Sequence, residues 1–485
     1  MNFTCMMRTQ SQTWRLMDSS LACKVELSLD KPAASRILSW VMCVFSLCAL
    51  PLGCGESGKR ATQDSSNSAN LAYAAEIATM QQAPNVEAID TTFIARLLES
   101  HPEYFGNIVK DGPRYRVQIL LGRIASDTPG KPRLVRSGFR VDAEYFYPAS
   151  SIKLLAAVGA LEHLNSYDNP MLGADTPMTI GPLFDGDTPQ NKDESNLDGG
   201  TITAGHEIRK LFLVSDNPAF NRLFDLCGHE SLNSQMHRAG LGSTVINHRL
   251  SESRAIPRQL DTAAITFHTP VGDVEQAAQQ SGLSLRNTSR ETQVGVGYLS
   301  KDQRIDTPME FAGRNGISLV DLQNALIMTV RPDIDLGLPG FELSDTDRLR
   351  LVYAMGQFPH ESLNPQYRGS DYPDHAYKLF LPGVRRAFMK ADQYGTGSTD
   401  LSSALSGVDN SANIRIYNKL GQAYGFTIEN AYIVTGRPEI EPFFLTAVIY
   451  TNEDGILNDN IYEYAAVAEP FMEHLAEVVA RSLWK

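Results

Sequence analysis

Cysteine is nearly absent from most of this sequence. Five of its six cysteines lie within the first 54 residues, and Cys227 alone lies beyond them. The main body of the chain therefore cannot hold an internal disulfide framework. Cys227 lies among apolar neighbours, and we expect it to be a small buried core residue.

The sequence also lacks features that several function classes need. It contains no complete G-x-x-x-x-G-K-[ST] loop and no well-placed G-x-G-x-x-G, which argues against a nucleotide site. The pentapeptide H-E-S-L-N occurs at 229–233 and at 360–364, but neither copy completes the zinc motif H-E-x-x-H. The net charge of −13 argues against a nucleic-acid partner, because phosphate binding needs clustered Lys and Arg. We expect neither a metal nor a cofactor.

An apolar stretch lies near the start of the chain. Residues 37–50 carry no charge, a basic flank precedes them, and Pro-Leu-Gly-Cys follows at 51–54. This pattern predicts a signal segment over 1–54, and the Gly-Cys pair resembles a bacterial lipoprotein site that would lipidate Cys54. A plain signal peptide and an uncleaved anchor remain alternatives. Each predicts an exported bacterial protein, either periplasmic or anchored to the membrane as a lipoprotein.

The rest of the chain divides into a tether and one globular domain. Residues 55–87 are rich in Ser, Ala, Asn and Gln, which predicts a flexible linker. From 88 to 485 we expect one domain, with 251–310 as a polar insertion. Strands are predicted over 115–125 and 134–147, helices follow, three strands cover 414–419, 423–434 and 443–451, and a helix covers 462–484. This order predicts an α+β fold with an antiparallel sheet of N- and C-terminal strands, flanking helices and an all-helical middle region.

The segment Pro148–Lys153 carries the first chemical motif. A strand is predicted to end there, and a helix to begin at Ser150, with Lys153 three residues later on the same helical face. Serine is a weak nucleophile until a base removes its proton, and a lysine with a lowered pKa can be that base. The positive end of the helix dipole favours an oxyanion formed on attack. Alone, S-x-x-K is equally compatible with a helix cap followed by a surface lysine.

Two further motifs follow in order. Ser215-Asp216-Asn217 ends an apolar run 65 residues after Ser150, where a capped turn between helices is the structural alternative. The segment Lys419-Leu420-Gly421 lies on a predicted strand near the end of the chain. A lysine and a nearby glycine on a strand can bring charge and bare backbone close to a ligand.

The three motifs together resemble those of class A serine β-lactamases and penicillin-binding enzymes, which are S-x-x-K, S-D-N and K-[TS]-G. The resemblance covers nearly all of the chain from about 88 to 485, and it implies a β-lactamase/transpeptidase-like fold. It further implies a serine hydrolase that acts on a small-molecule substrate, either a β-lactam or a cell-wall peptide-like amide, through an acyl-enzyme.

The resemblance implies a role for each matching residue. Ser150 would be the nucleophile, Lys153 would activate it or relay its proton, and Ser215 would pass a proton to the leaving nitrogen. Asn217 would contact Lys153 and the substrate amide, and Lys419 would bind a substrate carboxylate. The N–H groups of Ser150 and Gln422, beside Gly421, would bind the oxyanion. Asn221 would hold the omega loop in place.

Two positions depart from the family pattern. Leu420 replaces a Thr or Ser, and a site that lacks such a hydrogen bond loses about 1–3 kcal/mol. The omega-loop Glu that directs the deacylating water is expected at Leu250, and Glu252 is the nearest candidate catalytic carboxylate. Without a placed Glu, deacylation would be slow and the protein would behave as a penicillin binder.

Three functions therefore remain open. The leading one is opening of a β-lactam or related amide through acyl-Ser150. The second is a penicillin-binding D-Ala-D-Ala peptidase or an esterase on the same scaffold, which Leu420 and the insertion favour. The third is a surface lipoprotein, anchored through Cys54, that binds ligands and has lost catalysis.

Overall fold

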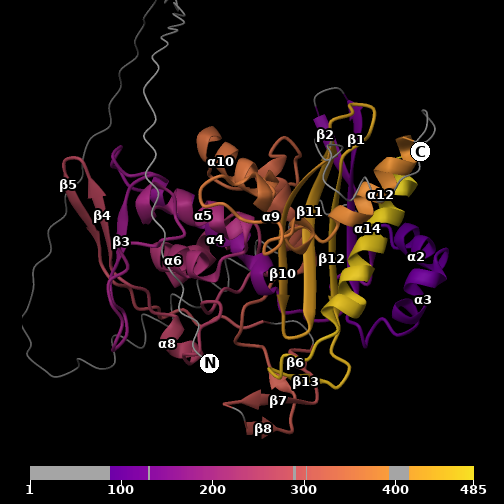
Figure 1. Ribbon diagram of the computed structural model, residues 1–485, viewed down its shortest axis with the longest axis horizontal. Helices are drawn as coiled ribbons and strands as arrows, with labels where there is room; N and C mark the ends of the chain where they lie inside the picture. Colours follow the sequence, from indigo (N-terminus) through magenta and orange to yellow (C-terminus); the bar gives the residue numbers. More distant parts are fainter. Residues whose placement is uncertain (1–87, 129–130, 288–290, 302, 393–413, 485) are drawn as a thin grey trace, which may run out of the picture. The chain divides into compact units, whose positions relative to one another are not determined.

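The computed structural model describes residues 88–485 except 129–130, 288–290, 302, 393–413 and 485 (Figure 1). The predicted signal segment with Cys54 and the predicted linker 55–87 lie outside the described residues. Within the part that is described, no helix is both long enough and apolar enough to cross a membrane.

A five-stranded antiparallel sheet in the order β10-β11-β12-β1-β2 forms the centre of the domain (Figure 1). The N-terminal and C-terminal strands of the described domain meet where β1 pairs with β12, with Leu121 opposite Leu445. The predicted sheet of N- and C-terminal strands is thereby confirmed. The strands are β1 (Gln118–Thr128), β2 (Lys131–Phe139), β10 (Ile414–Ala423), β11 (Phe426–Thr435) and β12 (Phe443–Tyr450).

The second strand, predicted over 134–147, is shorter at its C-terminal end than predicted. The strand ends at Phe139, because Arg140 and Asp142 adopt φ values of 52° and 54°, which lie outside the extended region. The chain then turns away from the sheet toward the motif that begins at Pro148.

The sheet separates two apolar cores. Along β12, Leu445 and Ala447 face one core, and Phe444 and Val448 face the other, as the two-residue period of a strand requires. The first core is covered by α2 (Thr92–Glu99), α3 (Pro102–Lys110), α12 (Leu381–Asp392) and α14 (Glu469–Leu483). Figure 1 shows α12 and α14 on the side of the sheet opposite to α9 (Leu319–Val330) and α10 (Asp345–Gly356).

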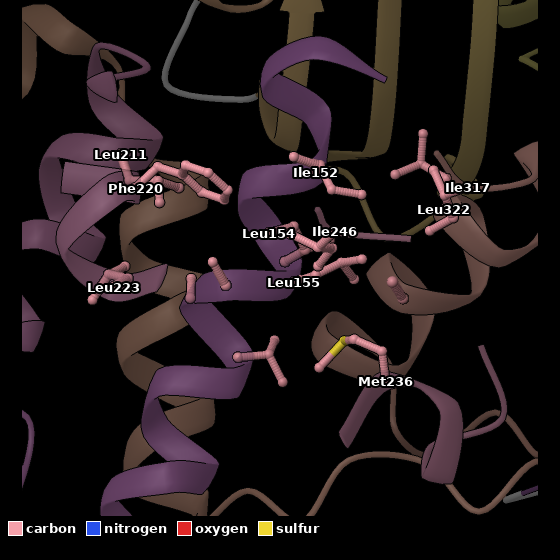
Figure 2. Packing of buried hydrophobic residues seen from close by; sticks show 14 of the residues in the cluster. Ile152, Leu154, Leu155, Leu211, Phe220, Leu223, Met236, Ile246, Ile317 and Leu322 are labelled. Atoms are coloured by element: carbon pink, nitrogen blue, oxygen red, sulfur yellow. The ribbon is translucent and has the colours of Figure 1, made fainter. Parts of the chain in front are cut away.

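Helix α4 (Lys153–Asn165) occupies the centre of the second core. Its sequence is apolar around nearly its whole circumference, as expected for a helix that is enclosed on all sides. In Figure 2, Leu154 and Leu155 lie between Phe220 on one side and Leu322 on the other. The surrounding helices include α5 (Ala204–Leu213), α6 (Asn217–Cys227) and α7 (His229–Arg238). Cys227 at the end of α6 is fully buried, as predicted.

The middle of the chain is not all helical. It also holds three small sheets, of orders β3-β4-β5, β13-β7-β8 and β6-β9. Their strands have two to five residues and several exposed positions, so they carry no clear apolar alternation in the sequence. They are β3 (Met178–Ile180), β4 (Ile265–Thr269), β5 (Gly272–Gln276), β6 (Gln293–Val294), β7 (Gly297–Ser300), β8 (Gln303–Ile305), β9 (Met309–Glu310) and β13 (Ile456–Leu457).

Short helical segments complete the domain. The predicted insertion 251–310 begins with α8 (Ile256–Gln259), and its β7 pairs in parallel with β13 from the segment before the last helix. The other segments are the turn η1 (Ala149–Ile152), η2 (Asp198–Gly200), η3 (Pro359–Glu361), α11 (Asp374–Tyr377) and the π-helix η5 (Tyr464–Ala468).

Candidate active site

Ser150 lies in the turn η1, which continues directly into α4. Ala149 before it has a φ of 48°, a strained value for a residue with a side chain and typical of functional turns. Ser150 is partly exposed and lines a cavity of about 1080 Å³. The neighbouring Ser151 is buried, and its hydroxyl donates a 2.6 Å hydrogen bond to the Pro148 carbonyl. Ser150 is therefore the accessible serine at the N-terminal end of the helix.

Lys153 is fully buried one turn further along. Its Nζ donates to the Asn217 Oδ1 at 2.6 Å, to the Ser215 hydroxyl at 3.3 Å and to the Ser215 carbonyl. Among the described residues, no hydrogen bond joins Lys153 Nζ to the Ser150 hydroxyl, as is common before a substrate binds. Burial, reinforced by the charge of Lys419, holds the pKa of Lys153 well below its usual value. Burial therefore favours the neutral amine, which can accept a proton.

Ser215 connects the two lysines of the site. The Lys419 Nζ donates to the Ser215 hydroxyl at 2.8 Å and to the Leu420 carbonyl at 2.9 Å. Ser215 itself has a φ of 56°, so its backbone is strained at the position where both lysines reach it. One hydroxyl thus lies within reach of two amines, which suits a proton relay.

The side chain of Lys419 extends from β10 on the side of the second core. A buried cluster of polar and charged residues on the opposite face of the sheet influences its pKa. Burial lowers the pKa of Lys419 to about 7, and the carboxylate of Glu429 opposes this effect. Glu429 accepts from Asn418 Nδ2 at 2.7 Å, and Lys378 Nζ donates to Asn418 Oδ1 at 2.8 Å. The sequence analysis missed Glu429 and Lys378. The available signal was Glu429 as the single charged residue of the strand at 426–435.

Gly421 allows strand β10 to lie against the nucleophile turn. A Cβ at Gly421 would lie 2.6 Å from the Pro148 carbonyl oxygen and 2.9 Å from the Ser150 nitrogen, closer than real Cβ atoms approach. The next residue, Gln422, lines the same cavity as Ser150. The two segments predicted to supply the oxyanion-binding N–H groups are therefore brought together.

Two asparagines connect the start of α6 to the loop at 247–255. Asn217 Nδ2 donates to the Ser251 hydroxyl at 2.7 Å. Asn221 accepts from the Leu250 N–H at 2.9 Å and donates to its carbonyl at 3.1 Å, which are the contacts that its predicted bracing role needs. Asp216 caps α6 by accepting from the Ala219 N–H at 2.7 Å, so the turn is capped without Ser215 or Asn217.

The two departures from the family pattern also have defined positions. Leu250, the position at which the family pattern predicts the missing Glu, lines the cavity around Ser150. Glu252 lines the same cavity, but its carboxylate accepts from Arg254 at 2.5 Å and from the Ser253 N–H at 2.9 Å. Leu420 is 7% exposed and packs into the first core, on the opposite face of the strand from Lys419.

The described part of the chain contains no group of three or more His, Cys, Asp and Glu side chains that could hold a metal ion. The groups that the site brings together are the hydroxyls of Ser150 and Ser215, the amines of Lys153 and Lys419, and the side chains that orient them.

Comparisons with known proteins agree with the predicted family. Residues 137–293 match the model of the Beta-lactamase enzyme family, a range that contains the first two motifs and ends before Lys419. This match confirms the family that the motifs predicted, and the α+β fold agrees with it. A comparison with curated proteins found no match.

Several solved structures resemble the domain at low identity. A beta lactamase from Xanthomonas campestris pv. campestris is 16% identical, with a TM-score of 0.40, 82% of this chain covered and 99% of that chain. PBP-A is 13% identical, with a TM-score of 0.41, and the match covers 82% of this chain and 98% of that chain. A beta-lactamase from Desulfarculus baarsii is 15% identical, with a TM-score of 0.41, and the match covers 82% of this chain and 99% of that chain. Identities and TM-scores this low add nothing to the family match and the site geometry.

Proposed function

We propose that this protein opens a β-lactam or a related amide by forming an acyl-enzyme on Ser150. The observation that carries the proposal is the convergence of the three motifs. Lys153 and Lys419, from α4 and β10, both donate to the hydroxyl of Ser215, and Gly421 brings β10 against the Ser150 amide.

The acylation step uses groups already in place. Ser150 Oγ attacks the substrate carbonyl carbon while Lys153 Nζ, whose lowered pKa favours the neutral amine, takes the hydroxyl proton. The backbone N–H groups of Ser150 and Gln422 bind the oxyanion of the tetrahedral intermediate. The C–N bond then breaks, Ser215 gives its proton to the departing nitrogen, and protonated Lys153 restores the proton of Ser215.

Lys419 fits the carboxylate that β-lactams and peptide C-termini share. Its ammonium is buried at 2% exposure and is directed at Ser215 rather than at solvent. A charge in such a site interacts strongly with a substrate anion, because little water screens it.

The fate of the acyl-enzyme separates two candidate functions. Leu250 provides no base for water, and the carboxylate of Glu252 is already bound to Arg254. These contacts favour slow deacylation, so that a penicillin-binding peptidase is the second candidate function. The signal segment predicted over 1–54, with Cys54, supports an exported location for either activity, in the periplasm or on the membrane.

The test uses purified protein, nitrocefin and a fluorescent penicillin. We expect Ser150 to be labelled, with the mass increase of one opened β-lactam, and Ser150→Ala to be unlabelled. Ser151→Ala is the matched control, since the Ser151 hydroxyl is bound to Pro148. Labelling that survives Ser150→Ala would refute the nucleophile assignment. Complete absence of an adduct on Ser150 would favour a ligand-binding lipoprotein.

A further inference from the structure

One arginine in the cavity around Ser150 has no carboxylate partner among the residues that the structure describes. Three arginines line this cavity, and Glu252 is the one acidic residue among the described lining residues. Arg249 is paired with Asp225, and Arg254 is paired with Glu252. Arg314 forms no ion pair within the described part of the chain, and its buried Nε has no hydrogen-bond partner there. A buried donor left unpaired is costly unless a ligand satisfies it.

Aromatic rings hold the Arg314 guanidinium in position. Its central carbon lies 5.7 Å from the centre of the Phe311 ring and 5.8 Å from that of Tyr424. These rings belong to a packed set, since Phe311 and Tyr424 lie 5.3 Å apart and Tyr147 lies 5.1 Å from Tyr424. Contacts with ring faces restrict the guanidinium without neutralising its charge.

The backbone around Arg314 is fixed as well. The Arg314 carbonyl accepts from Asn287 at 2.8 Å. The adjacent Asn315 is fully buried, and its Oδ1 accepts from the N–H groups of Asn247 at 2.8 Å and His248 at 3.1 Å. The segment that carries Arg314 is therefore docked on the start of the loop at 247–255. A charge held this firmly loses little entropy when it binds a ligand.

Arg314 lies at the opposite end of the site from Lys419. Strand β10 runs from Lys419 past Gly421 and Gln422, and Tyr424 follows its last residue. The four extended steps from Lys419 to Ala423 span roughly 14 Å. Lys419 does not line the cavity, whereas Ser150, Gln422, Tyr424 and Arg314 do. A substrate that lies along β10 with its carboxylate at Lys419 therefore directs its acyl portion toward Arg314.

We propose that Arg314 forms a second anion-binding subsite, which selects substrates whose acyl portion carries a carboxylate. Two guanidinium N–H groups face that carboxylate, and the ring of Tyr424, which lines the cavity, forms the apolar surface beside it. The inference rests on the proposed acylation of Ser150 and adds the chemical class of the acyl group. It also gives a role to the segment that directly follows the insertion at 251–310.

The test compares two penicillins that differ only in one carboxylate on the acyl side chain, benzylpenicillin and carbenicillin. We expect the wild-type protein to be acylated about tenfold faster by carbenicillin, in second-order rate constant, since one exposed charge-assisted contact is of that size. Arg314→Gln should abolish the preference, and Arg314→Lys should keep part of it. Arg304→Gln, at an exposed arginine of the insertion, is the matched control and should keep all of it.

A preference that survives Arg314→Gln, or its absence in a wild-type protein that is acylated, would overturn the inference. If neither penicillin acylates Ser150, the proposed function fails, and the subsite is tested by binding alone. Phenylmalonic acid monoamide and phenylacetamide, which also differ by one carboxylate, are then compared by saturation-transfer NMR. Tighter binding of the carboxylated amide that is lost in Arg314→Gln supports the subsite. Equal binding of the two amides refutes it.

Discussion

Gly421 lies directly against the backbone of Ser150. A methyl group added to Gly421 would lie 2.9 Å from the Ser150 nitrogen, although the two residues are 271 positions apart in the chain. The contact sets the distance between strand β10 and the turn η1, and with it the position of Gln422 opposite the nucleophile. The oxyanion site is therefore built by a close approach of two backbones, which only glycine permits.

Gly421→Ala should remove acylation while leaving the fold in place. The added methyl meets the Pro148 carbonyl at 2.6 Å, so strand and turn must separate. We expect the acylation rate constant to fall at least about 100-fold, the cost of losing one oxyanion contact. Overpacking should lower the free energy of unfolding by about 1–3 kcal/mol. Rates follow from fluorescent-penicillin labelling, and stability from urea denaturation.

Gly173→Ala provides the control, because a Cβ there meets no atom within 4 Å. It should leave both quantities unchanged. Wild-type acylation by Gly421→Ala would show that the close approach does not position the oxyanion site.

Asn217→Asp should keep the hydrogen bond to Lys153 but add a negative charge 2.6 Å from its Nζ. An opposite charge at this distance raises a lysine pKa, so Lys153 would stay protonated and could not accept the Ser150 proton. We expect acylation at pH 7 to fall about 100-fold or more, the usual size of a lost general base. With an uncharged p-nitrophenyl ester, which does not need protonated Lys419, the rate should recover partly as pH rises. Asn217→Ala removes the hydrogen bond without adding charge. It should not move the fall in rate at low pH toward higher pH values. A common pH profile for the two variants would contradict this account.

The pH dependence of acylation should differ between charged and uncharged substrates. Lys153 must be neutral, so the rate falls at low pH for every substrate. Lys419 must be protonated to bind a carboxylate, and its pKa is lowered to about 7, so the rate with benzylpenicillin also falls above about pH 7. An uncharged p-nitrophenyl ester should lack this alkaline limb. The second-order rate constant between about pH 5 and pH 9 measures both limbs. Identical alkaline limbs for the two substrates would rule out Lys419 as their cause.

The sequence predicted the elements of the site better than their electrostatic surroundings. Motif spacing placed Ser150 and Lys153 on one helix start, and the order of strands placed Lys419 on the same sheet as the N-terminal strands. The buried contacts of Lys378 and Glu429 were not predictable, because they depend on side chains meeting across a strand face from segments about 50 residues apart. The small strands of the insertion were missed for another reason: they are too short to show a period.

The loop at 247–255 gives the sharpest distinction between a hydrolase and a penicillin binder. Leu250 lines the cavity with a side chain that is 6% exposed and packs at the edge of the second core, and Asn221 fixes its backbone through two hydrogen bonds. Leu250→Glu should therefore place a carboxylate near the acyl-enzyme, with a pKa raised by burial, where it can accept a proton from water. We expect deacylation to accelerate at least about tenfold with acylation little changed, since general-base assistance supplies up to about 100-fold or more. Glu252→Gln should change deacylation less than about threefold, because Arg254 already holds that carboxylate. The half-life of the fluorescent acyl-enzyme measures both effects. Rapid wild-type turnover that disappears in Glu252→Gln would instead identify Glu252 as the deacylating base.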